Sequence, residues 1–245
     1  MCTVTFWPRR SGFRLGMNRD ERWSRPVALP PIQRQASRRR ALCPVEAGGG
    51  TWIGLNDAGV AFALINWYAV EPPPSAGSIS RGRVVEWLLS TSKPVDADAY
   101  LGALPLKRLK PFRVMGLFDR LRVVMEWRWD GKELKALSHP WAPRQWISSG
   151  LDEPASQKVR SDVFRRFSRR TDAGDHTWLR ALHGSHLPKR GPFSHCVHRE
   201  DAGTVSYSEI TVIGAGGAVF YQPGCPCEGR PGIHSALELI PAGEN

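Results

Sequence analysis

Short runs of β-branched and aromatic residues fill the first seventy positions of the chain, a pattern that predicts strands. The expected strands are residues 2–7, 13–18, 51–55 and 60–67. The connections 10–12 and 56–59 contain glycine or asparagine, which adopt the positive φ of tight turns at low cost. The chain is therefore predicted to open with two hairpins, separated by a long surface loop over the proline- and arginine-rich residues 24–48.

The middle of the chain changes to helical spacing and back again. Apolar residues recur every three or four positions in residues 79–90, and residues 96–104 indicate a second short helix. Residues 113–118 and 121–129 alternate around a short connection and predict a third hairpin, which residues 134–137 extend. Helices therefore follow strand pairs here, without a regular alternation.

The last third of the chain predicts one longer amphipathic helix over residues 156–170 and then further strands. The expected apolar face of this helix is Val159, Val163, Phe164 and Phe167, and its expected outer, basic side is Arg160, Arg165, Arg169 and Arg170. Late strands are expected over residues 195–198, 205–212 and 218–221, with a loop over residues 223–232. This order indicates the α+β class, with residues 1–245 forming a single domain of two packed antiparallel sheets and outer helices.

Composition and charge narrow the class of protein. A hydrophobic content of 41% with ten tryptophans supplies a core, and the net charge of +11 favours anionic partners. Five cysteines are too few and too odd in number for a disulfide scaffold, which favours a reducing compartment. The start of the chain lacks the apolar stretch of a signal peptide, and the longest apolar run, residues 59–70, is shorter than the ~20 residues of a membrane span. We therefore expect a cytoplasmic protein with no membrane span, and no pattern in the sequence fixes its oligomeric state.

Cys2 is the strongest candidate for chemistry. Initiator methionine is usually removed when the next residue is small, and its removal leaves a cysteine with both a thiol and a free α-amine. The α-amine has a pKa of about 7.7–8.0 and the thiol a pKa of about 8.5, so the amine can accept the thiol proton near neutral pH. The alternative is that Cys2 is simply a small buried residue at the start of a strand.

A polar sequence, Asn18-Arg19-Asp20-Glu21, ends the hairpin partner of the strand that Cys2 begins. Strand pairing is expected to bring Asp20 near Cys2, where its carboxylate would hold the ammonium or orient the thiol. Asn18 should face the same side as Asp20, because side chains alternate along a strand. The alternative is a polar strand end with surface salt bridges, which contribute little individually.

These residues occur together with Met-Cys-Thr at the start, Gly-Gly-Thr-Trp-Ile-Gly at 49–54 and a hydrophobic strand that ends in Asn66. The combination resembles the NRDE family, also called the transport and Golgi organisation family, and residues 146–151 extend the resemblance more weakly. It implies a four-layer αββα fold of the N-terminal nucleophile hydrolase type. Related proteins are the choloylglycine hydrolases and penicillin acylases, which cleave amide bonds.

Carried over to this sequence, the resemblance implies that Cys2 is the nucleophile, Asp20 its orienting carboxylate and Asn66 a donor in the oxyanion hole. Such a donor can contribute about 3–4 kcal/mol. Without that context, an asparagine at a strand end commonly hydrogen-bonds a turn. Asn18, Arg19 and Ser149 are the expected substrate-binding residues.

Three departures from the family pattern limit which activities the resemblance implies for this chain. Met17 replaces an arginine that choloylglycine hydrolases carry, with Arg19 shifted along the strand, and Val205 replaces a late arginine of the family. Ser149 replaces an asparagine, so a hydroxyl would substitute for an amide donor. The expected pocket therefore lacks the usual guanidinium groups, and bile-salt or penicillin hydrolysis does not follow from the resemblance.

Metal and nucleic-acid sites are weaker hypotheses. His195, Cys196 and His198 lie far in sequence from Cys225 and Cys227, and this spacing does not match a zinc finger, so we expect no metal and no cofactor. Arginine and lysine clusters lack any nucleic-acid-binding motif and are expected to be solvated, with no specific nucleic-acid partner. The glycine-rich segments lack the ending of a phosphate loop.

The sequence thus predicts an N-terminal cysteine amidohydrolase that cleaves the C–N bond of a small acyl substrate. A different class remains open: a non-catalytic carrier of haem or lipid with the same fold, a role to which relatives in the family have been linked. The missing arginines favour the carrier, whereas the absence of a Cys-x-x-Cys-His haem-attachment motif does not.

Overall fold

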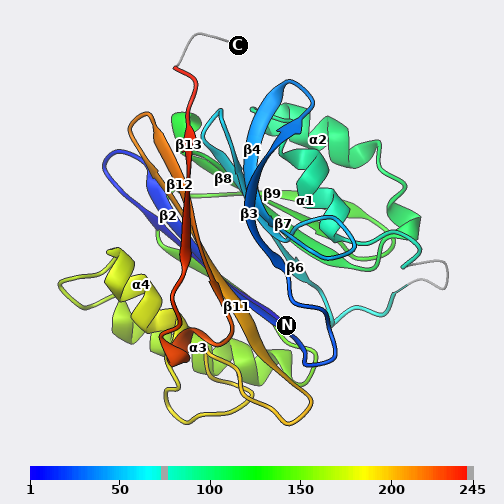
Figure 1. The fold of residues 1–245 in the computed structure, drawn as a ribbon. Helices are drawn as coiled ribbons and strands as arrows, with labels where there is room; N and C mark the ends of the chain where they lie inside the picture. Colours follow the sequence, from blue (N-terminus) through cyan, green and yellow to red (C-terminus); the bar gives the residue numbers. More distant parts are fainter. Residues whose placement is uncertain (73–76, 242–245) are drawn as a thin grey trace.

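The computed structural model of the protein describes residues 1–72 and 77–241. Within these residues two antiparallel sheets, of six and seven strands, lie face to face between two pairs of helices (Figure 1). Helices α1 and α2 pack on the outer face of the seven-stranded sheet, and α3 and α4 pack on the six-stranded sheet. The prediction of an α+β fold with two packed sheets and outer helices is confirmed.

The six-stranded sheet contains the first and the last of the described strands and has the order β10-β1-β2-β11-β12-β13. Its strands are β1 (Cys2–Pro8), β2 (Phe13–Arg22), β10 (Arg144–Ser148), β11 (Ala202–Ile213), β12 (Gly216–Pro223) and β13 (Ile233–Glu238). The predicted first hairpin is present as β1 and β2, and β2 extends through the polar sequence that ends at Glu21. Strands β10 and β13 were not predicted.

The seven-stranded sheet follows the chain order from β3 to β9. Its strands are β3 (Leu29–Ala36), β4 (Arg39–Val45), β5 (Ile53–Asn56), β6 (Val60–Asn66), β7 (Phe112–Phe118), β8 (Val123–Trp129) and β9 (Leu134–His139). The expected surface loop over residues 24–48 is wrong, because β3 and β4 form a hairpin there. Strand β3 is at the sheet edge, where proline is tolerated because one side of the backbone needs no ladder partner.

The helices are α1 (Gly82–Leu88), α2 (Pro94–Gly102), α3 (Glu153–Phe167) and α4 (His176–His183), and α4 was not predicted. Residues 195–198, expected to form a strand, make only isolated bridges through Val197 and His198. Among the described residues, every helix is too short or too polar to cross a lipid bilayer.

Three apolar layers hold the four structural layers together. The central one lies between the sheets, where Val4, Phe6 and Leu15 meet Leu55 and other residues of the facing sheet. Each of the two outer layers lies between one sheet and the helices that cover it. Cys2 belongs to the central layer, so its side chain points toward the facing sheet and not toward the helices.

Candidate active site

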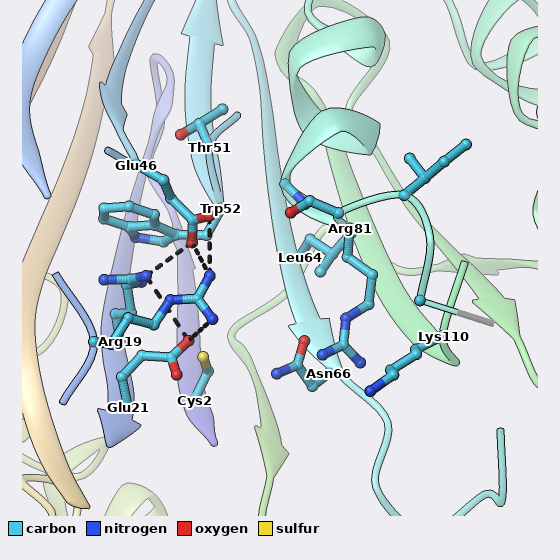
Figure 2. A pocket seen from close by; sticks show the side chains of 15 residues that line it. Cys2, Arg19, Glu21, Glu46, Thr51, Trp52, Leu64, Asn66, Arg81 and Lys110 are labelled. Atoms are coloured by element: carbon cyan, nitrogen blue, oxygen red, sulfur yellow. Dashed lines mark hydrogen bonds and ion pairs between the residues drawn. The ribbon is translucent and has the colours of Figure 1, made fainter. Parts of the chain in front are cut away.

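Cys2 begins β1 in the interior of the six-stranded sheet, where it pairs with Arg19 on β2 and Ser148 on β10. Only 7% of the residue is exposed. Cys2 nevertheless forms part of the wall of a cavity of about 210 Å³ between the two sheets (Figure 2). The thiol is therefore enclosed but has access to a space in which a small molecule fits.

The surroundings of the Cys2 thiol favour its neutral form. Burial raises the pKa of this thiol, the nearby N-terminal ammonium lowers it, and the Asp20 and Glu21 carboxylates raise it further. The net result is a pKa above the ordinary value of 9.0. A thiol in this environment needs a base to become a nucleophile, because the thiolate is the reactive form.

Met1 occupies the position next to Cys2 and is itself buried. Its ammonium donates hydrogen bonds to the Asp20 carbonyl (3.1 Å) and the Tyr68 hydroxyl (3.3 Å), and its sulfur lies 3.6 Å from the Ser149 hydroxyl. Burial lowers the pKa of this ammonium, but the neighbouring Cys2, Tyr68 and Asp20 groups outweigh burial and raise it. With Met1 present, the nitrogen of Cys2 is a peptide nitrogen and has no basic lone pair. A base on Cys2 itself therefore requires a chain that begins at Cys2.

Asp20 is fully buried and holds the N-terminal residue through its backbone. Its amide donates to the Met1 carbonyl at 3.1 Å, while its carboxylate accepts a 2.6 Å hydrogen bond from the Thr204 hydroxyl. The other carboxylate oxygen, Oδ2, has no hydrogen-bond partner among the described residues. Burial raises the pKa of Asp20, and this outweighs the opposing effects of Arg160, the N-terminal ammonium and Thr204.

Arg160 is a site residue that the sequence analysis placed on the wrong side of its helix. Its guanidinium, expected in solvent, is fully buried, donates to the Thr3 hydroxyl at 2.8 Å and lies 3.9 Å from Asp20. The buried face of α3 consists of Ser156, Arg160, Val163 and Phe167. These residues are four, three and four positions apart, which is the spacing of one helix face. The buried Asp20 carboxylate on the facing strand explains why an arginine occupies this face.

Asn66 ends β6 and lies on the opposite side of the cavity from Cys2 (Figure 2). Its amide donates a 2.7 Å hydrogen bond to the hydroxyl of Tyr68, which also accepts from the Met1 ammonium. Tyr68 therefore connects Asn66 to the N-terminus. Tyr68 was not predicted, because nothing in the local sequence indicates that its side chain reaches back to residue 1.

Arg19 lies on the cavity side of β2, because it is directly opposite Cys2 in the strand register. Its guanidinium stacks on Trp52 with 4.4 Å between its central carbon and the ring centroid, and donates to Glu46 at 2.8 Å. Glu46 also accepts from Arg25 at 3.0 Å. These contacts hold two arginines in one wall of the cavity and pair them with acid.

Arg81 and Lys110 line the opposite wall, beside Asn66 (Figure 2). Arg81 donates to the Pro111 carbonyl at 3.0 Å, and burial lowers its pKa. Four cationic side chains and two carboxylates thus line the cavity: Arg19, Arg25, Arg81, Lys110, Glu21 and Glu46. The cavity therefore contains guanidinium groups. They come from other positions than 17 and 205, where Met17 and Val205 replace the arginines of related proteins.

Asn18 and Ser149 do not line this cavity. Asn18 faces the helix layer, as Asp20 does, and its amide donates to the carbonyls of His183 and His195, both at 2.8 Å. Ser149 lies beside the Met1 sulfur and accepts a 3.3 Å hydrogen bond from the Leu151 amide. Asn18 is thus positioned to hold two segments together, and Ser149 borders the space that Met1 fills.

Comparison with known proteins gives a family match and a fold match. Residues 1–116 match the model of the family described as Transport and Golgi organisation 2. No curated protein matches the sequence.

The solved structures that the fold resembles include penicillin V acylase from Agrobacterium tumefaciens, with 11% identity, a TM-score of 0.51, and coverage of 91% of this chain and 83% of that chain. Two variants of conjugated bile acid hydrolase from Clostridium perfringens each give a TM-score of 0.52. The first is 12% identical, with coverage of 97% of this chain and 92% of the other; the second is 11% identical, with full coverage of both. At these identities the likeness establishes the fold, which is that of the N-terminal nucleophile hydrolases.

Proposed function

Because residues 1–116 match the model of the Transport and Golgi organisation 2 family and the chain has an N-terminal nucleophile hydrolase fold, we propose that the protein is an amidohydrolase that uses Cys2. The active form begins at Cys2, after Met1 is removed. Its substrate is a small linear amide. One arrangement supports the proposal above all others: the Cys2 thiol and the Asn66 amide line opposite sides of one cavity.

The reaction begins when the α-amine of Cys2 accepts the thiol proton and the sulfur attacks the amide carbon. The negative charge that develops on the substrate oxygen is stabilised by the Asn66 side-chain amide. The ammonium then gives its proton to the leaving nitrogen as the C–N bond breaks, which leaves a thioester on Cys2. Water, deprotonated by the same amine, hydrolyses the thioester to a carboxylic acid and restores the thiol.

The cavity also indicates what the substrate carries. Arg19 and Arg25 are paired with Glu46, whereas Arg81 and Lys110 form no ion pair with an acid in the part of the chain that the structure describes. A carboxylate on the substrate would pair with Arg81 and Lys110, because a carboxylate accepts charge-assisted hydrogen bonds from guanidinium and ammonium groups. We therefore favour N-acyl amino acids and related anionic amides.

The volume of the cavity favours a small acyl substrate over haem. Pockets for drug-sized ligands typically measure about 300–1,000 Å³, and this cavity measures about 210 Å³ between its described walls. Removal of Met1 would add the space beside Ser149. The enlarged site would then extend from Ser149 past Cys2 to Asn66.

The test begins with the mass of the purified chain, which should correspond to loss of Met1. Wild type, Cys2→Ala, Cys2→Ser and the control Cys43→Ala are then compared on a panel of N-acyl amino acids. Cys43 is buried on the outer side of the seven-stranded sheet, away from the cavity, so its thiol should be dispensable. Activity should disappear in Cys2→Ala and persist in Cys43→Ala.

Labelling of Cys2 with iodoacetamide is located by peptide mapping, because Cys227 is also an exposed cysteine. Retention of Met1 in a chain that hydrolyses the panel would contradict the proposed base. Full activity in Cys2→Ala would contradict the nucleophile. Stoichiometric haem binding that is lost in Cys2→Ala, without hydrolysis, would favour the carrier.

A further inference from the structure

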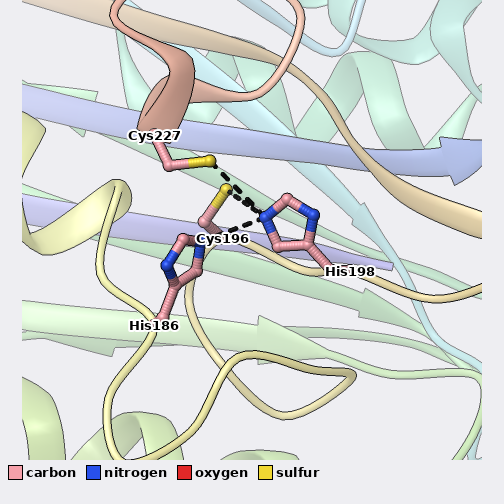
Figure 3. Close-up of side chains that lie close together, drawn as sticks. All are labelled: His186, Cys196, His198 and Cys227. Carbon is pink, nitrogen blue, oxygen red and sulfur yellow. Dashed lines mark hydrogen bonds between the residues drawn. The ribbon is translucent and has the colours of Figure 1, made fainter.

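Four side chains with metal-binding atoms converge at one point, outside the Cys2 cavity. His186, Cys196 and His198 lie in the segment between α4 and β11, and Cys227 lies in the short 3-10 helix Pro226–Glu228 that follows β12 (Figure 3). One ligand atom from each residue lies within 4.8 Å of all the others. The expectation of no metal rested on the spacing of His195, Cys196 and His198 relative to Cys225 and Cys227, and His186 was not part of that pattern.

The three distances between His198 and the other side chains are close to those of a tetrahedral zinc site. The Nε2 atom of His198 lies 3.0 Å from Nε2 of His186, 3.4 Å from Sγ of Cys196 and 3.5 Å from Sγ of Cys227. Zinc binds sulfur at ~2.3 Å and histidine nitrogen at ~2.0–2.1 Å, so tetrahedral ligands are separated by about 3.3–3.8 Å. The three distances to His198 therefore differ from tetrahedral separations by only a few tenths of an ångström. The other pairs of ligand atoms lie within 4.8 Å and would close by up to about 1 Å to share one ion.

Hydrogen bonding alone does not account for this arrangement. A single imidazole nitrogen carries either one proton or one lone pair, so it satisfies one hydrogen-bond partner well. Here three partners converge on Nε2 of His198. A cation at the centre resolves the crowding, because each of the four side chains then directs its own lone pair at the metal.

We propose that His186, Cys196, His198 and Cys227 bind one Zn²⁺ ion. Two thiolates balance the charge of the ion, and the two thiol protons are released to solvent when it binds. All four coordination positions come from the protein, which is the pattern of structural zinc sites, whereas catalytic sites keep a position open for water. The ion would thus fasten the segment between α4 and β11 to the end of β12.

Arg190 must turn away when the metal binds. In the structure its guanidinium donates to Nδ1 of His198 at 3.1 Å. Metal binding through Nε2 requires the proton of the neutral imidazole to reside on Nδ1, which then no longer accepts a hydrogen bond. Arg190 is exposed, so this movement meets little resistance.

The site also supports the surroundings of Asp20. Val197 lies between the two ligands Cys196 and His198, and its amide donates to the Thr204 hydroxyl at 2.8 Å. The same hydroxyl donates to the Asp20 carboxylate. Zinc would therefore fix the backbone at Val197, which is connected to the Asp20 carboxylate through one residue, Thr204.

Cys225 provides a matched control. It is two residues from Cys227, but its thiol donates to the Thr204 carbonyl at 3.1 Å and is not among the four converging ligands. Wild type, Cys227→Ala, His186→Ala and Cys225→Ala are purified with a reducing agent, loaded with ZnSO₄ and desalted, and their zinc content is measured. Wild type and Cys225→Ala should retain one zinc per chain.

Cys227→Ala and His186→Ala should bind zinc at least about 100-fold more weakly, because even outer-shell changes weaken metal sites by about 10–100-fold. Titration of wild type with Co²⁺ gives an answer that does not depend on any variant: tetrahedral cobalt with two thiolates shows intense visible bands and sulfur charge-transfer bands. Wild type without zinc, unchanged zinc retention in Cys227→Ala, or a weak octahedral cobalt spectrum would each overturn the proposal. So would a disulfide between Cys196 and Cys227 that persists in the presence of the reducing agent.

Discussion

Arg160 on α3 and Asp20 on β2 face each other at 3.9 Å, and neither side chain is accessible to solvent. The pair joins the helix layer to the strand that holds the N-terminal residue. Removal of one partner of such a pair is costly, because the remaining charge is buried without compensation. The Arg160–Asp20 pair therefore sets the stability of the region behind Cys2.

We predict that Arg160→Met lowers the free energy of unfolding by about 3–5 kcal/mol. The matched control is Arg165→Met on the same helix, whose side chain is 70% exposed and whose replacement should change stability by less than about 0.5 kcal/mol. Urea denaturation followed by circular dichroism measures both. Equal effects of the two substitutions would show that the buried pair contributes nothing specific.

Glu126 on β8 should make stability depend on pH in the acid range. Burial by itself raises the pKa of this carboxyl, but hydrogen bonds from Arg128, Arg113 and His139 outweigh burial and lower the pKa to about 2. Since the folded pKa lies below the ordinary value of 4.5, the stabilisation is complete above pH ~4.5 and is lost as the pH falls toward 2. Its size is on the order of 3 kcal/mol.

Glu126→Gln should therefore be less stable than wild type by on the order of 3 kcal/mol at pH 7, and the difference should shrink toward zero near pH 2. Urea denaturation at a series of pH values measures it. Glu133→Gln is the control, because that side chain is 64% exposed. A difference that stays constant with pH would contradict the assignment.

Asn66→Ala tests the oxyanion donor of the proposed reaction. Loss of a single donor of this kind lowers kcat by about 10²–10³. We expect that loss with KM nearly unchanged, because the donor acts mainly on the charge that develops during reaction. Tyr68→Phe, which removes the hydroxyl that Asn66 contacts, should keep most of the activity. Wild-type kcat in Asn66→Ala would exclude the role.

Arg81→Ala tests the charge preference of the cavity. A hydrogen bond to a charged group contributes about 1.5–3 kcal/mol, which corresponds to a rise in KM of about ten- to a hundredfold for an anionic amide. A neutral amide should show little change. Arg83→Ala is the control, since Arg83 pairs with Glu86 at 2.7 Å and does not line the cavity. Equal effects on anionic and neutral substrates would contradict a direct contact.

Gly12→Ala should destabilise the first hairpin by about 1–3 kcal/mol. Gly12 has a φ of 101°, and a Cβ atom there would collide with the Val212 carbonyl on β11. Gly48→Ala is the control, because Gly48 has open space and an ordinary φ. Thermal unfolding of both variants measures the effect, and a hairpin that accepts alanine at position 12 without loss would contradict it.

The first hairpin shows what local sequence predicts well. Strands β1 and β2 are neighbours in the chain and are joined by a short turn that contains Gly12, so one local pattern specifies both strands and their pairing. The polar residues of β2 were less predictable. Asn18 and Asp20 are buried because β11 and the helix layer cover them, whereas Arg19 is buried on the other face against Trp52 and Glu46, and none of these neighbours is close in sequence.

For strand β3 and for Arg160, the local sequence pattern predicted the wrong structure. Two prolines and several polar residues suggested a loop, yet the segment forms an edge strand because its neighbour β4 contributes the buried Ala41, Leu42 and Cys43. The charge of Arg160 suggested solvent, yet Thr3 and Asp20 supply its partners. In both cases the deciding group lies on another element.

By itself, the sequence determined that a thiol follows Met1, that the first two strands form a hairpin, and that the class is α+β, because each depends on residues close together along the chain. The tertiary structure alone decided that Asn66 and Arg81 lie across a cavity from Cys2. It alone decided that four metal-binding side chains from two separate segments meet. The physical reason is that long-range strand pairing and helix packing bring together side chains whose separation in sequence carries no periodic signal.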